Sequence, residues 1–163
     1  MIKVLIFTDY FFPGFRGGGP IQSIKNLCDA LDKDLELTVF TRAHDFKKSH
    51  AQYDGIQIDQ MNNLNDYRVF YASRLTFISI FKTIKQNNPD VLYLNSFFST
   101  LSIKVLIIKY FFFSGKAIVL APRGEFSPGA LALKKLKKSI YINFFIFTRV
   151  ARNISFHATD EAE

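Results

Sequence analysis

The chain has 163 residues, of which 48% are hydrophobic, and this fits a single domain with a sizeable core. It carries 19 phenylalanines, no tryptophan and a formal net charge of +7, with a pI of about 9.5. A basic surface suits phosphorylated substrates, anionic lipids and nucleic acid equally well, so charge alone does not choose among them. The one cysteine, Cys28, excludes an internal disulfide and any zinc site built on several cysteines.

No targeting segment stands out. The N-terminus reads as a core strand and lacks the small-residue cleavage site of a signal peptide. The longest uncharged apolar run, Ser139 to Thr148, is about half of what spans a bilayer. We therefore expect a cytoplasmic protein.

The first predicted unit is a strand followed by a helix. The continuous apolar run from Ile2 to Thr8 predicts a parallel strand buried on both faces. A loop, Asp9–Gly19, follows, and Pro20 suits the first turn of a helix. The helix is predicted to bury one stripe, made of Ile21, Ile24, Leu27, Cys28 and Leu31.

A second strand is predicted over Leu35–Thr41, and a polar surface loop over Ala43–Asp54. The loop contains His44 and His50. Two histidines could bind a metal, but nothing nearby completes a ligand set, so we interpret them as solvated side chains.

Between Gly55 and Gln86 the residue pattern predicts secondary structure less clearly. Gly55–Met61 alternates with period two and predicts a half-exposed third strand, and Asn62–Asp66 has turn composition. Tyr67–Ala72 could be a short strand or the lead-in to a helix. Ser73 is the predicted N-cap of a helix from Arg74 to about Gln86. Its inner stripe would be Phe77, Ile80, Phe81 and Ile84.

The last third alternates strands and helices again. Strands are predicted at Val91–Asn95, Ala117–Ala121 and Ile154–Ala158. The helix Phe98–Phe113 is apolar nearly all round, so it is either sandwiched in the core or in contact with a membrane. A long basic helix is predicted over Ala130–Arg152, with one half-circle carrying Lys134, Lys135, Lys137, Lys138, Arg149 and Arg152.

This alternation predicts an α/β fold: a Rossmann-like three-layer sandwich with a mostly parallel sheet. Ligands of such sheets bind outside the carboxyl ends of the strands. Four segments are predicted to lie on that rim, namely Asp9–Gly19, Thr41–Asp45, Asn95–Ser99 and Pro122–Gly129.

The glycine run Gly17–Gly19 lets backbone amides approach a ligand, and a helix N-terminus favours anions. Phosphate binding and a merely flexible connection are about equally supported. Pro20, Ile21 and Gln22 follow the glycines, so the dinucleotide-binding fingerprint fails. The Gly-Lys-Ser/Thr triplet of nucleotide hydrolases does not occur, and neither does a serine elbow for nucleophilic catalysis.

Four stretches carry a resemblance to a known family: FFPGFRGGGP, APRGEFSPGAL, KKLKKSIY and FHATDEAE. Together they resemble the N-terminal, acceptor-side half of a GT-B fold glycosyltransferase of retaining family four, which includes capsule, O-antigen and exopolysaccharide enzymes. The resemblance covers nearly all of residues 1–163. It implies one Rossmann-like domain whose C-terminal donor-binding partner is absent, so that this chain alone would be inactive.

The resemblance also implies a substrate set and site residues. A nucleotide-sugar would be the donor, a lipid-linked saccharide the acceptor, and no cofactor would be needed. Donor phosphates would lie against Arg16, Gly17, Gly18 and Gly19. The sugar cleft would be lined by Asn95, Ser96, Arg123, Gly124 and Glu125. An Arg123–Glu125 pair that only shapes the loop is the alternative for those two residues.

The predicted basic helix suits an anionic membrane surface or an acceptor phosphate, through Lys134, Lys135, Lys137 and Lys138. A solvated helix face is an equal alternative. For the whole chain, the competing hypothesis is a non-catalytic Rossmann-like module that binds a phosphorylated ligand or a partner subunit. Nucleic-acid binding rests on charge alone, without a recognition motif, and is not expected.

Overall fold

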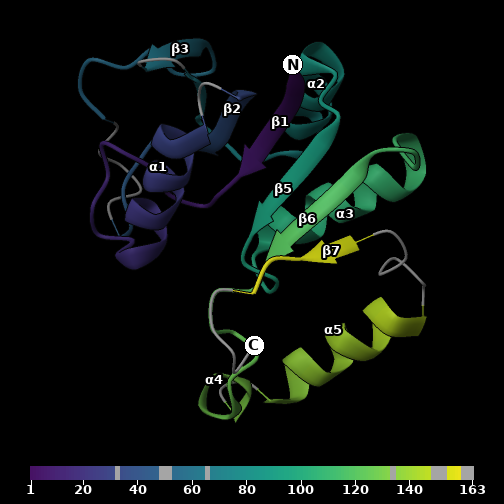
Figure 1. Cartoon of the computed structure of the whole chain (residues 1–163). Coiled ribbons are helices and arrows are strands. Elements are labelled where there is room, and N and C mark those ends of the chain that lie inside the picture. Colours follow the sequence, from purple (N-terminus) through teal and green to yellow (C-terminus); the bar gives the residue numbers. More distant parts are fainter. Residues whose placement is uncertain (32–33, 48–52, 65–66, 133–134, 148–153, 159–163) are drawn as a thin grey trace.

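The computed structural model describes residues 1–31, 34–47, 53–64, 67–132, 135–147 and 154–158. Within them the strands form one sheet in the order β3-β4-β2-β1-β5-β6-β7 (Figure 1). The strands are β1 (Ile2–Phe7), β2 (Leu35–Arg42), β3 (Met61–Leu64), β4 (Tyr67–Ala72), β5 (Val91–Asn95), β6 (Ala117–Ala121) and β7 (Ile154–Phe156). Neighbouring strands run parallel except β3 and β4, which are antiparallel. The predicted Rossmann-like, mostly parallel sheet is confirmed.

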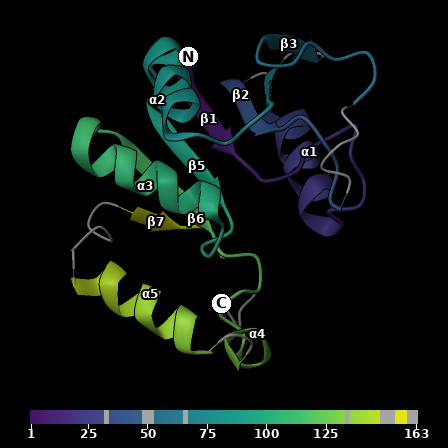
Figure 2. The same cartoon turned by 180° about the vertical axis from the view of Figure 1, so that it is seen from behind.

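Helices cover both faces of the sheet. They are α1 (Gly19–Leu31), α2 (Phe77–Asn87), α3 (Thr100–Phe112), α4 (Pro128–Ala132) and α5 (Lys135–Phe147). Helix α1 lies on one face, whereas α2 and α3 lie on the other (Figures 1 and 2). As predicted, α1 begins at the glycine turn, and it buries Ile21, Ile24 and Cys28.

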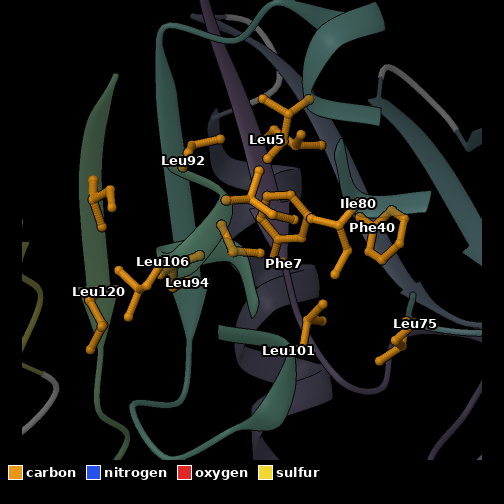
Figure 3. Close-up of a cluster of buried hydrophobic side chains, with 14 of the residues drawn as sticks. Leu5, Phe7, Phe40, Leu75, Ile80, Leu92, Leu94, Leu101, Leu106 and Leu120 are labelled. Atoms are coloured by element: carbon orange, nitrogen blue, oxygen red, sulfur yellow. The ribbon is translucent and has the colours of Figure 1, made fainter. Parts of the chain in front are cut away.

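The core has two halves because side chains of a strand alternate between the faces of the sheet. Leu5 and Phe7 of β1 join the cluster under α2 and α3 (Figure 3), in which the rings of Phe7 and Phe40 lie 5.4 Å apart. Ile6, between them in sequence, joins the opposite cluster with Ile24 of α1. Strand β1 is thus buried on both faces, as its continuous apolar run predicted.

The predicted strand over Gly55–Met61 is wrong. The strand here is β3, and it falls mainly on the residues that we predicted to be a turn. Gly55 and Asp59 have positive φ, which interrupts extended backbone. The Asn62 side chain then bonds both backbone groups of Gln57, accepting from its amide at 2.8 Å and donating to its carbonyl at 2.7 Å. The amide and carbonyl of Gln57 are thus bonded to a side chain, and they are not available to pair with a neighbouring strand.

The predicted N-cap at Ser73 is also wrong, because α2 begins one turn later. Thr76 caps it: its hydroxyl accepts from the Ser79 amide at 3.0 Å, and the Ser79 hydroxyl accepts from the Thr76 amide at 3.1 Å. This reciprocal capping box satisfies two backbone donors at the start of α2. Upstream, the ambiguous Tyr67–Ala72 forms strand β4.

The predicted long basic helix is two helices, α4 and α5, in the described residues. Lys134, Arg149 and Arg152 lie outside those residues. Lys137 is exposed, but Lys138 turns inward: its ammonium donates to the Ala130 carbonyl at 2.7 Å and lies 4.5 Å from the Phe98 ring centroid. A cation near the last carbonyls of α4 stabilises that helix end, so the predicted basic half-circle does not form as a unit.

Candidate anion-binding site

A cavity of about 260 Å³ opens at the carboxyl ends of β1 and β5. These central strands are neighbours, and the chain proceeds from them to opposite edges of the sheet, which makes this the topological switch point where α/β sheets bind ligands. The lining residues are Thr8, Asp9, Tyr10, Gly17, Pro20, Ile21, Asn95, Ser96, Arg123 and Glu125. The glycine turn and the loop after β6 therefore meet at one site.

Arg123 is the cation of this cavity. Its Nε donates to Asn95 Oδ1 at 2.7 Å, its Nη1 to Ser23 Oγ at 2.8 Å and its Nη2 to Tyr93 Oη at 3.3 Å. These acceptors are all neutral, and the ion pairs among the described residues do not include Arg123. The guanidinium is therefore fixed in place without being neutralised.

The acceptors of Arg123 belong to a wider polar network. Buried Asn95 also donates from Nδ2 to Thr8 Oγ1 at 3.2 Å, which fixes the orientation of its amide. Tyr93 Oη lies 2.8 Å from Nδ1 of His157, next to β7. Burial raises the pKa of the Tyr93 phenol, although the charge of Arg123 opposes the rise. The phenol thus stays neutral and accepts from Arg123, while the tautomer of His157 sets the direction of the Tyr93–His157 bond.

Glu125 lines the cavity but is engaged by its own protein. One carboxylate oxygen accepts from the Ser96 hydroxyl at 2.6 Å, and the other accepts from the amides of Phe97 and Phe98. The predicted alternative, a pair with Arg123, is absent from the ion pairs of the described residues. Glu125 instead anchors the segment that leads into α3.

Asp9 forms the opposite wall. Its carboxylate accepts from the Ser99 hydroxyl, which also caps α3, and from Arg42 Nη2 at 3.0 Å. It therefore ties together the carboxyl ends of β1 and β2 and the start of α3. Because Arg42 balances this carboxylate, the lining charges outside the ion pairs of the described residues are the Arg123 guanidinium and the Glu125 carboxylate, and the carboxylate is taken up by three donors of its own protein.

The three glycines of the turn have different requirements. A Cβ on Gly17 would lie 2.9 Å from Cδ1 of Ile21, so this glycine allows a close approach between the turn and α1. Gly18 has a φ of +73°, which other residues rarely adopt. A Cβ on Gly19 would meet nothing within 4 Å. Only Gly17 of the three lines the cavity.

Arg16 is a neighbour of the site and not part of its lining. Its guanidinium lies 5.9 Å from the Phe15 ring centroid, and its amide, like that of Phe15, donates to the Asp45 carboxylate. Burial raises the pKa of Asp45, but the amide bonds from Phe15, Arg16 and Phe46 outweigh it and leave the pKa below the usual value. Asp45 thus anchors the approach to the glycine turn.

Two of the cavity residues, Ser96 and Arg123, have positive φ angles. Ser96 has a φ of 88° and Arg123 a φ of 58°, and Gly124 follows at 77°. Left-handed conformations cost non-glycine residues energy and recur at ligand-binding sites. Here they turn two strand ends so that Ser96 and Arg123 face the same space.

Sequence reasoning missed Tyr93, His157 and Ser23. Their residue types carried no signal: Ser23 lies inside α1, Tyr93 lies inside β5, and His157 directly follows β7. Thr8 and Asp9 were identifiable only as members of a rim segment. Lys137 and Lys138 were predicted as a phosphate or membrane site, and they do not line this cavity. Within the described residues no cluster of three His, Cys, Asp or Glu side chains could hold a metal ion.

No known family model matches the chain, and no curated protein matches it. Among the solved structures that do match is the Kef CTD of Shewanella denitrificans in an AMP-bound form. The match has 12% sequence identity and a TM-score of 0.42, and it covers 73% of this chain and 58% of the other. The matched region is thus less than two thirds of that structure.

These comparisons contradict the resemblance to retaining family-four glycosyltransferases, because neither a family model nor a curated protein of that kind matches. Of the motifs that carried the resemblance, FFPGFRGGGP and APRGEFSPGAL fall mainly on loops, KKLKKSIY falls mainly on α5, and FHATDEAE lies largely outside the described residues. The structure gives the two loop motifs a local explanation: the Arg123–Gly124 turn needs consecutive positive φ angles, and the glycine turn needs close packing. Such needs arise in many Rossmann-like sheets and do not specify a family.

Proposed function

We propose that the protein is a binding module for a phosphorylated small molecule, which is held against Arg123 at the carboxyl ends of β1 and β5. The observation that carries the proposal is the state of Arg123. Its guanidinium is fixed by Asn95, Ser23 and Tyr93, and none of these neutralises it. A fixed, unpaired guanidinium in a concave site favours phosphate or carboxylate.

The position of α1 supports a phosphate. Pro20 and Ile21 of its first turn line the same cavity as Arg123, so the positive end of the helix and the guanidinium act on one volume. A backbone turn without side chains at Gly17 leaves room for oxygen atoms to approach. A cavity of about 260 Å³ accepts a phosphate with part of the group that it is attached to. A nucleotide is the ligand class that we propose to test first.

The test is calorimetric titration of the chain with AMP and with inorganic phosphate at low salt. We expect saturable binding of at least one of them. Arg123→Gln should weaken it at least tenfold, because a charge-assisted contact contributes about 1.5–3 kcal/mol. The matched control is Arg74→Gln, which removes the same charge from an exposed position outside the cavity.

A second variant separates binding from folding. Asn95→Asp keeps the size of the side chain and the bond to Arg123 Nε but supplies a carboxylate partner. We expect it to fold and to lose anion binding. Absence of binding in the wild type, or equal weakening by Arg123→Gln and Arg74→Gln, would refute the proposal.

Other predictions from the sequence stay untested. They include catalytic turnover, the absent second domain, and ligand contacts by Ser96, Gly124 and Glu125. Membrane contact through Lys137 and Lys138 is a separate prediction, because neither residue lines this cavity.

A further inference from the structure

The helices on the α2–α3 face of the sheet expose large apolar side chains to solvent. Helix α3 is apolar around its whole circumference, and its outer side is not covered within the described residues. Tyr110, Phe111 and Phe112 at its C-terminal end are 54%, 70% and 66% exposed. The exposed large apolar residues of α5 are Leu136, Ile140 and Ile146. An uncovered apolar surface of this kind marks an interaction site.

The exposed rings form a connected cluster with α2. The ring centroids of Tyr110 and Phe111 are 5.1 Å apart, and those of Phe112 and Phe81 of α2 are 5.3 Å apart. Phe111 and Phe112 are in contact as well, at 6.4 Å. The aromatic cluster therefore spans the outer ridge of α3 and its junction with α2.

The charged residues of the three helices that expose apolar side chains are all lysines. Helices α2, α3 and α5 contain seven lysines and no Asp or Glu. Lys82 and Lys85 of α2 flank Phe81 in sequence and are exposed. Lys116, just past α3, reaches back to Asn88 beyond the end of α2, its ammonium donating at 2.7 Å. The formal charge of these three helices is therefore of one sign, while the Asp59 carboxylate lies with Lys82 along a groove beside α2.

We propose that the outer face of α2 and α3 docks on an anionic phospholipid membrane, with Phe111 and its neighbouring rings in the interface and Lys82 and Lys85 at the headgroups. Aromatic rings prefer the interfacial region, and lysines near an anionic leaflet add attraction. Attachment is peripheral, because no helix in the described part of the chain is long and apolar enough to cross the bilayer. The sequence left membrane contact open for the helix Phe98–Phe113, which corresponds to α3; the basic helix, its other predicted membrane surface, turns Lys138 inward.

Charge decides against a second copy of the chain as the occupant. Two copies joined through this face would bring their lysines together without a carboxylate on these helices to balance them. An anionic membrane supplies both the apolar layer for Phe111 and the negative charge for Lys82 and Lys85. It is the partner whose chemistry matches both features.

The test is co-sedimentation of the chain with vesicles of neutral phosphatidylcholine, with and without about one third phosphatidylglycerol. We expect binding to the anionic vesicles only. Lys82→Gln with Lys85→Gln should lower the partition coefficient roughly 25-fold, at about fivefold for each lysine. Phe111→Ser should lower it at least tenfold, because an exposed ring loses its apolar contact with the lipid.

Matched controls come from the other side of the molecule. Phe15 is 75% exposed, and Lys47 is exposed too, so Phe15→Ser and Lys47→Gln make the same chemical changes away from the helices. They should bind as the wild type does. Failure of the wild type to bind anionic vesicles, or equal losses in the controls, would overturn the proposal. If the chain binds anionic vesicles but not AMP or phosphate, the proposed ligand site is refuted and the membrane proposal stands.

Discussion

Asp45 offers the sharpest test of how the site is assembled. The carboxylate is 6% exposed and accepts from the amides of Phe15, Arg16 and Phe46 at 3.1, 3.2 and 2.7 Å. Replacement by Asn leaves one oxygen and removes the charge. A hydrogen bond to a charged group contributes about 1.5–3 kcal/mol, and a neutral one about 0.5–1.5 kcal/mol. We therefore expect Asp45→Asn to lower the free energy of unfolding by about 2 kcal/mol at pH 7.

The pH dependence follows from the lowered pKa of Asp45. In the unfolded chain this carboxyl has the ordinary pKa of about 3.9. A lower pKa in the folded state means that the stabilisation is complete above that pH and is lost as the pH falls through the folded value. The difference between wild type and Asp45→Asn should thus shrink below about pH 4.

The assay is urea denaturation at a series of pH values, followed by circular dichroism. Asp54→Asn is the control, since Asp54 is an exposed carboxylate in the same part of the chain. It should change stability by less than about 0.5 kcal/mol. The reasoning fails if Asp45→Asn is as stable as this control at pH 7, or if its deficit stays constant down to pH 3.

Three further outcomes are expected in the same denaturation assay. Gly17→Ala should lower the free energy of unfolding by roughly 1–3 kcal/mol, because the new Cβ would meet Ile21. Gly19→Ala is its control: it has open space around it and should be neutral or stabilising. Equal effects of the two substitutions would contradict the packing argument. Thr76→Ala should cost about 1 kcal/mol by removing the cap of α2, and no loss would place the cap elsewhere. Phe97→Ala should cost roughly 3–5 kcal/mol, since this buried ring packs within 5.0 Å of four other aromatic rings, and a loss below about 1 kcal/mol would show that the cluster collapses to fill the space.

Local residue patterns predicted the secondary structure correctly where they favoured one type of element. The apolar run Ile2–Phe7, interrupted only by Lys3, favours a strand covered on both sides, and β1 is buried on both faces over Leu5–Phe7. Pro20 after three glycines suits the first turn of a helix, and α1 begins there. Parallel strands then place their carboxyl ends on one edge, which brought Gly17 and Arg123 to one cavity.

Patterns failed where two segments competed for one role. Gly55–Met61 alternates like an edge strand, but the Asn62 side chain takes the backbone groups of Gln57 and shifts the strand to Met61–Leu64. Both Ser73 and Thr76 can cap a helix, and only Ser79, three residues after Thr76, decides between them. The residue pattern of Gly55–Met61, or of the residues around Ser73, does not show which alternative forms. The deciding hydrogen bonds come from Asn62 and Ser79, which lie outside those stretches.

The order of apolar, polar and glycine residues determined by itself the α/β class, the parallel sheet and the rim on which ligands would lie, since periodicity and turn chemistry act over a few neighbouring residues. The partner of each charged side chain was decided only by the tertiary structure. Arg123 meets Ser23 and Tyr93, Glu125 turns to Ser96 instead of Arg123, and Lys138 folds back onto Ala130. Long side chains reach partners distant in sequence, and whether a charge is neutralised depends on which atoms the fold brings within about 3 Å of it.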